Sequence, residues 1–128
     1  RISLVARRSD GNAEAEAALK NASDAVAAGD FKTAIEHCDR GIARYWFDPQ
    51  AHYLRGFALQ ALSEPAQAIE AYDRASAFGY APFWVRYNRG AAHVSVGNRD
   101  AAIRDIAEAG RLDASHEGVK TLKAALGL

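Results

Sequence analysis

The sequence contains one cysteine, three prolines and no methionine among its 128 residues. A single cysteine excludes an internal disulfide framework and a zinc site built from several thiolates. Sixteen Lys and Arg residues balance sixteen Asp and Glu residues, so no net charge attracts nucleic acid or an acidic membrane surface. No apolar run approaches the roughly 20 residues that a membrane-spanning helix needs. We therefore expect neither nucleic-acid binding nor membrane association.

Alanine dominates what the sequence does contain. It occurs 29 times, against 14 occurrences of Val, Ile and Thr together. Because alanine is the best helix former and β-branched residues favour strands, this composition predicts an all-α fold. Methionine is missing even from position 1, and no signal peptide is visible. We expect a cytoplasmic protein whose chain has been processed or cut from a longer one.

The chain repeats itself with a period of 34 residues. A shift by 34 aligns three classes of small residue and one class of isoleucine. The classes are Ala22, Gly56, Gly90; Ala34, Ala68, Ala102; Gly41, Ala75, Ala109; and Ile35, Ile69, Ile103. A period of this length is typical of folds that stack one supersecondary unit on the next. Small side chains at repeated sites let neighbouring helices pack closely, so we assign these residues to the core.

This pattern resembles the tetratricopeptide repeat (TPR), a 34-residue helix–turn–helix unit with small residues at its eighth, twentieth and twenty-seventh positions. The resemblance covers residues 15–116, and the segment Gly29-Asp30-Phe31 fits the turn between the two helices of a repeat. It implies a TPR-like right-handed α-solenoid of three helix–turn–helix hairpins with a C-terminal capping helix. The expected repeats are 15–48, 49–82 and 83–116, and the expected capping helix is 116–126.

Local capping signals predict seven helices. Side chains that accept hydrogen bonds at helix starts, or prolines of the first turn, precede most of them. The expected starts are Asn12, Asp30, Asp48-Pro49, Ser63, Pro82, Gly97-Asn98 and Ser115. We expect residues 1–11 to be a flexible lead-in and residues 12–128 to form a single domain.

The resemblance implies that the first helix of each repeat lines a concave groove. Ten of the twelve aromatic residues lie in two windows, 45–57 and 78–87, near the starts of two of these helices. Aromatic side chains on a concave surface are typical anchors for a partner. We therefore predict a non-catalytic protein–protein interaction module that binds a peptide or partner segment. The predicted binding residues are Gln50, Tyr53, Leu54, Phe57, Gln60, Trp84, Tyr87 and Asn88. For Trp46 and Tyr80, binding and packing stay equally open.

One TPR subclass holds the C-terminal carboxylate of chaperone tails with lysine, arginine and asparagine at specified groove positions. In this sequence the resemblance places Leu19, Ser23, Leu54, Trp84 and Asn88 there. Since none of these is a cation, we do not expect a carboxylate clamp.

The second helices carry charge pairs four residues apart, which stabilise a helix by about 0.2–0.5 kcal/mol each. They are Glu36–Arg40, Glu70–Arg74 and, with the signs exchanged, Arg104–Glu108. Because the position tolerates either sign, we expect a solvated outer face that has no binding role.

The four histidines occupy four different repeat positions, so they do not suggest a zinc site. They are His37, His52, His93 and His116. Cys38 stands where the resemblance places a buried aromatic, which favours an inert thiol over a nucleophile. We predict no catalytic residue, no metal and no cofactor. The alternative function is a structural or self-association domain, part of a longer enzyme or scaffold, whose aromatic windows dock a second copy.

Overall fold

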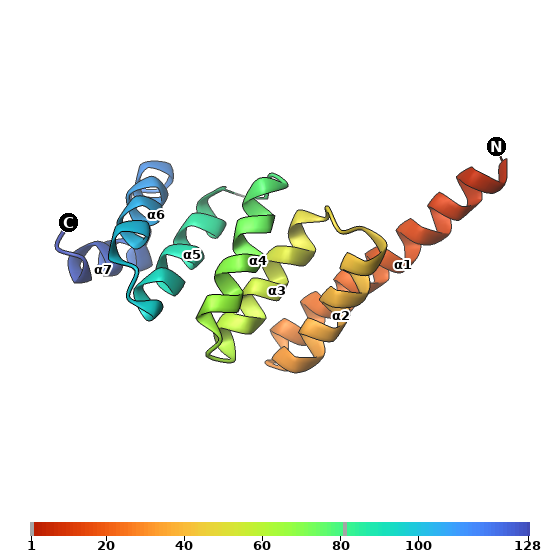
Figure 1. Cartoon of the computed structure of the whole chain (residues 1–128), viewed down its shortest axis with the longest axis horizontal. Helices are drawn as coiled ribbons and strands as arrows, with labels where there is room; N and C mark the ends of the chain where they lie inside the picture. The colour runs from red at the N-terminus through yellow and green to blue at the C-terminus, as the bar shows by residue number, and fades with distance from the viewer. Residues whose placement is uncertain (1, 81) are drawn as a thin grey trace.

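The computed structural model describes the backbone of residues 2–80 and 82–128, and the side chains of residues 13–80 and 82–128. This part of the chain forms seven α-helices and contains no strand (Figure 1). The helices are α1 (Ile2–Ala27), α2 (Phe31–Arg44), α3 (Pro49–Ala61), α4 (Pro65–Ala77), α5 (Pro82–Val96), α6 (Arg99–Leu112) and α7 (Glu117–Ala125). The prediction of an all-α fold is confirmed.

Consecutive helices pack as three hairpins, α1 with α2, α3 with α4, and α5 with α6. The hairpins stack in chain order into an elongated row, because α2 contacts α3 and α4 contacts α5 (Figure 1). The first helices also touch one another across the row, α1 with α3 and α3 with α5, and α7 packs on α6 at the C-terminal end. The first helices therefore share one surface and the second helices share another.

Glycines on the first helices allow this close packing. A Cβ atom at Gly56 would lie 2.7 Å from the ring of Tyr72, and one at Gly90 would lie 2.6 Å from the side chain of Ile106. Both distances are too short for any side chain, and Tyr72 and Ile106 are fully buried. The repeated small residues are therefore core contacts, as predicted.

The first hairpin makes the same contact with a different pair of residues. Ala22 takes the position of Gly56, and Cys38 takes the position of Tyr72. Both are fully buried, and the smaller thiol leaves room for the alanine methyl group. Burial, followed by the nearby Asp39 charge, raises the pKa of Cys38 to about 12. The prediction of a buried thiol is confirmed, and the thiol stays protonated at neutral pH.

Two of the predicted N-caps are confirmed. The backbone N–H of Thr33 donates to Oδ1 of Asp30 at 3.2 Å, and that of Gln50 donates to Oδ1 of Asp48 at 3.0 Å. These short polar side chains satisfy N–H groups that have no partner inside the helix. They fix where α2 and α3 begin.

The predicted start of the first helix is wrong. α1 begins at Ile2 instead of after Asn12, and it includes Gly11. A helix can contain a glycine at a cost of about 1 kcal/mol relative to alanine, and no proline interrupts residues 2–11. The side chains of residues 1–12 lie outside the described part of the chain. The mobility of the lead-in, residues 1–11, stays a prediction.

Two further helix starts differ from the prediction. Ser63 does not cap α4, because its φ of 62° places it in the left-handed conformation that closes α3, and Glu64 is the N-cap. Ser115 instead donates a hydrogen bond from its hydroxyl to Oδ1 of Asp113 at 2.8 Å. The N-cap of α7 is His116, whose Nδ1 accepts from the backbone N–H of Val119 at 3.3 Å.

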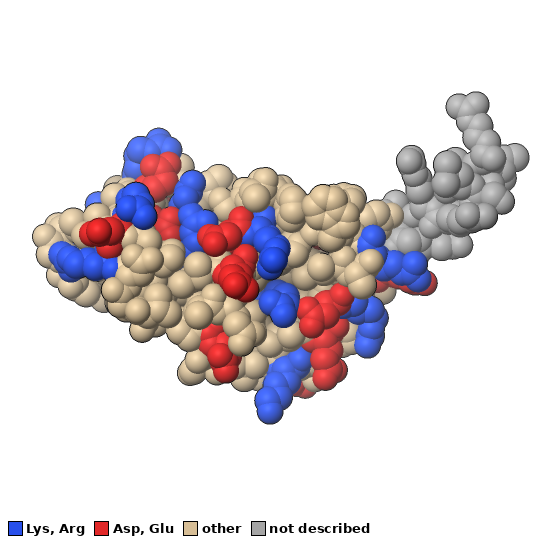
Figure 2. Space-filling view, in the orientation of Figure 1, with Lys and Arg blue, Asp and Glu red and all other residues tan. Residues whose placement is uncertain are grey.

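Acidic and basic side chains are interspersed over the face formed by α2, α4 and α6 (Figure 2). None of the three predicted pairs on these helices is an ion pair in the described residues; Glu108, for example, pairs with Arg111 at 2.6 Å. Two other ion pairs link one hairpin to the next. Arg55 on α3 reaches Asp39 on α2 at 2.8 Å, and 34 residues later Arg89 on α5 reaches Asp73 on α4 at 3.0 Å.

Candidate partner-binding surface

A hollow of about 260 Å³ lies between the first helices α3 and α5. Phe57, Gln60 and Ala61 line it from α3, and Asn88 lines it from α5. The ring of Phe57 is 37% exposed and lies 6.5 Å from that of Phe31, measured between centroids. We call this hollow the α3–α5 groove; its lining combines one exposed aromatic ring with two amide side chains.

Tyr53 supports the groove from one side. Its hydroxyl accepts a hydrogen bond from Nδ2 of Asn88 at 2.8 Å, and its ring stacks on Tyr80 with centroids 4.7 Å apart. Burial, and then the neighbouring Tyr80, raise the pKa of Tyr53 to about 12, although the hydrogen bond from Asn88 acts in the opposite direction. Tyr53 is therefore neutral at physiological pH and holds the Asn88 amide in place.

Gln60 serves both the core and the groove. Its Oε1 accepts a hydrogen bond at 2.7 Å from the hydroxyl of Tyr72, which is fully buried. Its NH₂ group makes no hydrogen bond to any of the described residues. Gln60 therefore has donors free for a carbonyl group of a partner.

Trp84 and Tyr87 differ in accessibility. Trp84 is 47% exposed, and its carbonyl oxygen accepts a second hydrogen bond from Nδ2 of Asn88 at 3.0 Å. Tyr87 is half-buried, with its ring stacked on Phe83 at 6.0 Å and 4.7 Å from the ring of His116. A Cβ atom at position 118 would overlap its hydroxyl. Tyr87 thus packs against the junction that leads into α7.

The structure brings five of the eight predicted residues together. Tyr53, Phe57, Gln60, Trp84 and Asn88 line the α3–α5 groove or hydrogen-bond to a residue that does. Leu54 is only 9% exposed and packs with Ala22 and Cys38 in the core. Gln50 and Tyr87 lie outside the lining. The binding roles of all eight residues stay predictions.

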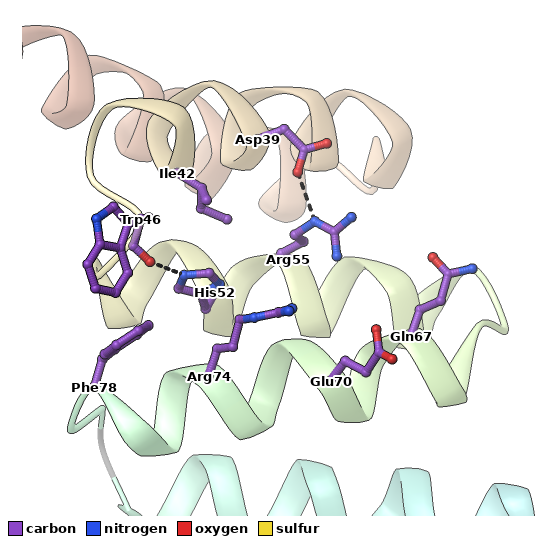
Figure 3. A pocket seen from close by; sticks show the side chains of 9 residues that line it. All are labelled: Asp39, Ile42, Trp46, His52, Arg55, Gln67, Glu70, Arg74 and Phe78. Atoms are coloured by element: carbon purple, nitrogen blue, oxygen red, sulfur yellow. Dashed lines mark hydrogen bonds and ion pairs between the residues drawn. The ribbon is translucent and has the colours of Figure 1, made fainter.

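A larger hollow, of about 550 Å³, lies on the side of the second helices (Figure 3). It lies between α2 and α4, with residues of α3 also lining it. Its lining includes Asp39, Trp46, Arg55, Glu70, Arg74 and Phe78. We call it the outer cleft. The sequence does not predict it. The 34-residue spacing between Asp39–Arg55 and Asp73–Arg89 could have located the two ion pairs, but not the open space beside the first of them.

In the part of the chain that the structure describes, no group of three His, Cys, Asp or Glu side chains is arranged to hold a metal ion. No helix in that part combines the length and apolar content that crossing a bilayer requires.

No protein-family model and no curated protein matches the sequence. Solved structures do match in three dimensions. The second TPR domain of the human RPAP3 protein, in complex with the HSP70 peptide SGPTIEEVD, has a TM-score of 0.84 at 18% identity, over 92% of this chain and 98% of that one. The Arabidopsis OM64 TPR domain has a TM-score of 0.84 at 17% identity, over 91% and 96%.

A third match concerns a longer protein. A mutant O-GlcNAc transferase from Thermobaculum terrenum has a TM-score of 0.80 at 21% identity, over 88% of this chain but 22% of that one. At these identities the similarity establishes the fold alone. Three stacked helical hairpins closed by a seventh helix, together with these matches, show that the chain has the TPR fold.

Proposed function

We propose that this chain is a non-catalytic interaction module that binds a peptide or partner segment in the α3–α5 groove. The observation that carries this proposal is the exposed ring of Phe57 beside the amides of Gln60 and Asn88. Contact with the ring buries apolar surface of the partner, and the amides hydrogen-bond to its backbone. Grooves with an apolar anchor and a few fixed polar groups are typical of peptide sites.

The solved relatives support a peptide as the kind of ligand. The RPAP3 domain is bound to a peptide that ends in the acidic sequence EEVD. The lining of the α3–α5 groove has no charged side chain. We therefore propose that the partner segment is apolar and uncharged where it meets the groove.

A matched pair of phenylalanine variants tests this proposal. Phe57→Ala removes the groove anchor, while Phe47→Ala removes a 50% exposed ring that lines neither hollow. Proteins captured from the native extract by the wild type should still be captured by Phe47→Ala. Phe57→Ala should weaken their binding by about 2 kcal/mol, roughly 30-fold, with unchanged helical content. If both variants bind the captured proteins with equal affinity, the α3–α5 groove is not the binding site.

Self-association is the second candidate function. Trp46 and Phe47 are adjacent, largely exposed and in edge-to-face contact at 5.6 Å, so they form an apolar patch outside the α3–α5 groove. Sedimentation over a hundredfold concentration range tests it. A dimer that Trp46→Ala dissociates would support self-association, and a monomer throughout would exclude it.

A further inference from the structure

A second cleft with the same arrangement lies between the second and third hairpins. A shift by 34 residues maps Asp39 and Arg55 onto Asp73 and Arg89, which line this cleft between α4 and α6. The second cleft has a volume of about 260 Å³, against about 550 Å³ for the outer cleft. The two clefts are built from equivalent helix positions. A comparison of the residues that differ therefore shows why the arginine of the second cleft is fully paired and that of the outer cleft is not.

In the second cleft, the chain supplies its own carboxylate. Arg89 donates from Nε and Nη2 to the two oxygens of Asp105, at 2.8 and 2.9 Å, and from Nη1 to Asp73 at 3.0 Å. Asp105 is buried, and Arg86 approaches it at 3.4 Å. All three nitrogen atoms of the Arg89 guanidinium are therefore used, in the two-pronged geometry that arginine favours with carboxylates.

In the outer cleft, the equivalent carboxylate is missing. The position of Asp105 is occupied by Ala71, and Arg55 donates only from Nε, to Asp39 at 2.8 Å. Its two Nη groups make no hydrogen bond to the described residues. The Arg55 side chain is 28% exposed, against 11% for Arg89. Arg55 thus has an unused fork of donors facing an open space.

Other side chains define the neighbourhood of that space. The side chain of Arg74 extends into the cleft beside Arg55, and Glu70 lies one turn away on the same helix (Figure 3). At the other end, Trp46 and Phe78 meet edge to face at 5.5 Å. The cleft therefore joins an arginine pair to an aromatic wall, with two carboxylates, those of Asp39 and Glu70, near the arginines.

We propose that the outer cleft binds an acidic side chain of a partner protein segment, in the place that Asp105 takes in the second cleft. The partner carboxylate receives hydrogen bonds from the Nη groups of Arg55 and from Arg74. An apolar neighbour of the acidic residue packs on Trp46 and Phe78. This site opens on the side of the second helices and shares no lining residue with the α3–α5 groove, so it is separate from that groove.

Capped tripeptides provide the probe. Phe-Asp-Phe and its neutral match Phe-Asn-Phe are titrated into ¹⁵N-labelled protein at millimolar concentration, with acetate alone as a third arm. Phe-Asp-Phe should bind at least fivefold tighter than Phe-Asn-Phe and should shift the signals of Arg55 and the Trp46 indole. Equal affinity of the two peptides would overturn the proposal. So would shifts confined to α3–α5 groove residues, or acetate binding as tightly as Phe-Asp-Phe.

Three exposed residues give the matched variants. Arg74→Gln should weaken Phe-Asp-Phe at least threefold, while Arg40→Gln, at the equivalent position of α2 outside the cleft, should leave its affinity unchanged. Glu70→Gln removes a negative charge that repels the peptide carboxylate, so Phe-Asp-Phe should bind more tightly. An unchanged affinity in Arg74→Gln, or weaker binding in Glu70→Gln, would contradict the proposal.

Discussion

Asn88 on α5 donates a hydrogen bond from Nδ2 to the hydroxyl of Tyr53 on α3, at a distance of 2.8 Å. The two residues belong to different hairpins and are 35 positions apart in the sequence. Because Asn88 also lines the α3–α5 groove, this bond ties the position of a groove amide to the stacking of two repeats.

Removing that hydroxyl should cost stability without unfolding the chain. Tyr53→Phe is expected to lower the free energy of unfolding by about 0.5–1.5 kcal/mol, the usual contribution of one hydrogen bond. Urea denaturation followed by circular dichroism measures it. Tyr45→Phe is the control, since the Tyr45 hydroxyl makes no hydrogen bond to the described residues. Equal losses in both variants would show that the bond to Asn88 contributes nothing.

Glycines at two repeat positions should respond in opposite directions to alanine. Gly56→Ala places a methyl group against the Tyr72 ring, so we expect a loss of about 1–3 kcal/mol in the free energy of unfolding. A Cβ atom at Gly41 would lie 3.6 Å from that of Ala18, an ordinary contact. Gly41→Ala should therefore stabilise the helix by about 0.5–1 kcal/mol. Thermal and urea unfolding of the two variants and the wild type measure these differences. A Gly56→Ala protein as stable as the wild type would show that Gly56 and Tyr72 are not in close contact.

Two aspartates that pair with arginines should differ in importance. The carboxylate of Asp105 is buried, and its hydrogen bonds are the main cause of the raised pKa of Arg89. Asp105→Ala leaves that largely buried guanidinium without its main partner, so we expect a loss of about 3–5 kcal/mol in unfolding free energy. Asp39→Ala breaks an ion pair whose carboxylate is exposed, so we expect the free energy of unfolding to fall by only about 0–1 kcal/mol. Similar losses from both would contradict the buried character of the Asp105 site.

Tyr53 and Tyr72 should ionise at a higher pH than an unburied tyrosine. Burial is the main cause that raises the pKa of Tyr53 to about 12 and shifts that of Tyr72 upward as well. Because the unfolded chain ionises near pH 10, these two phenols stabilise the fold below that pH. Their contribution is lost as the pH rises through the folded values.

Absorbance at 295 nm measures this titration, and circular dichroism reports the fold. We expect a protein that is still helical at pH 11, in which Tyr53→Phe has one protonated phenol fewer than the wild type. Ionisation of all five tyrosines near pH 10 in a protein that stays helical would refute the buried environment of both rings.

The sequence was sufficient wherever a feature depends on residues close in the chain or on the repeat itself. The 34-residue period located the close contacts of Gly56 and Gly90, and the Asp30 and Asp48 side chains located two helix starts. The sequence does not place Ser63 correctly, because a serine before a proline-led helix fits an N-cap as well as a left-handed turn residue.

Features that depend on three helices at once could not be predicted. Leu54 occupies a repeat position expected to face the groove, yet it packs toward the core. Beside the outer cleft Ala71 stands where the second cleft has Asp105, and no local pattern shows that this difference leaves Arg55 without a second carboxylate. Side chains from neighbouring elements decide both cases.

The most direct test of the central claim uses light-induced crosslinking from inside the groove. Benzoylphenylalanine replaces Phe57 in one protein and Phe47 in another, and each is illuminated in the native extract. We expect a discrete crosslinked partner from position 57 and none from position 47. A partner crosslinked from position 47 and absent from position 57 would show that the α3–α5 groove is not the binding surface.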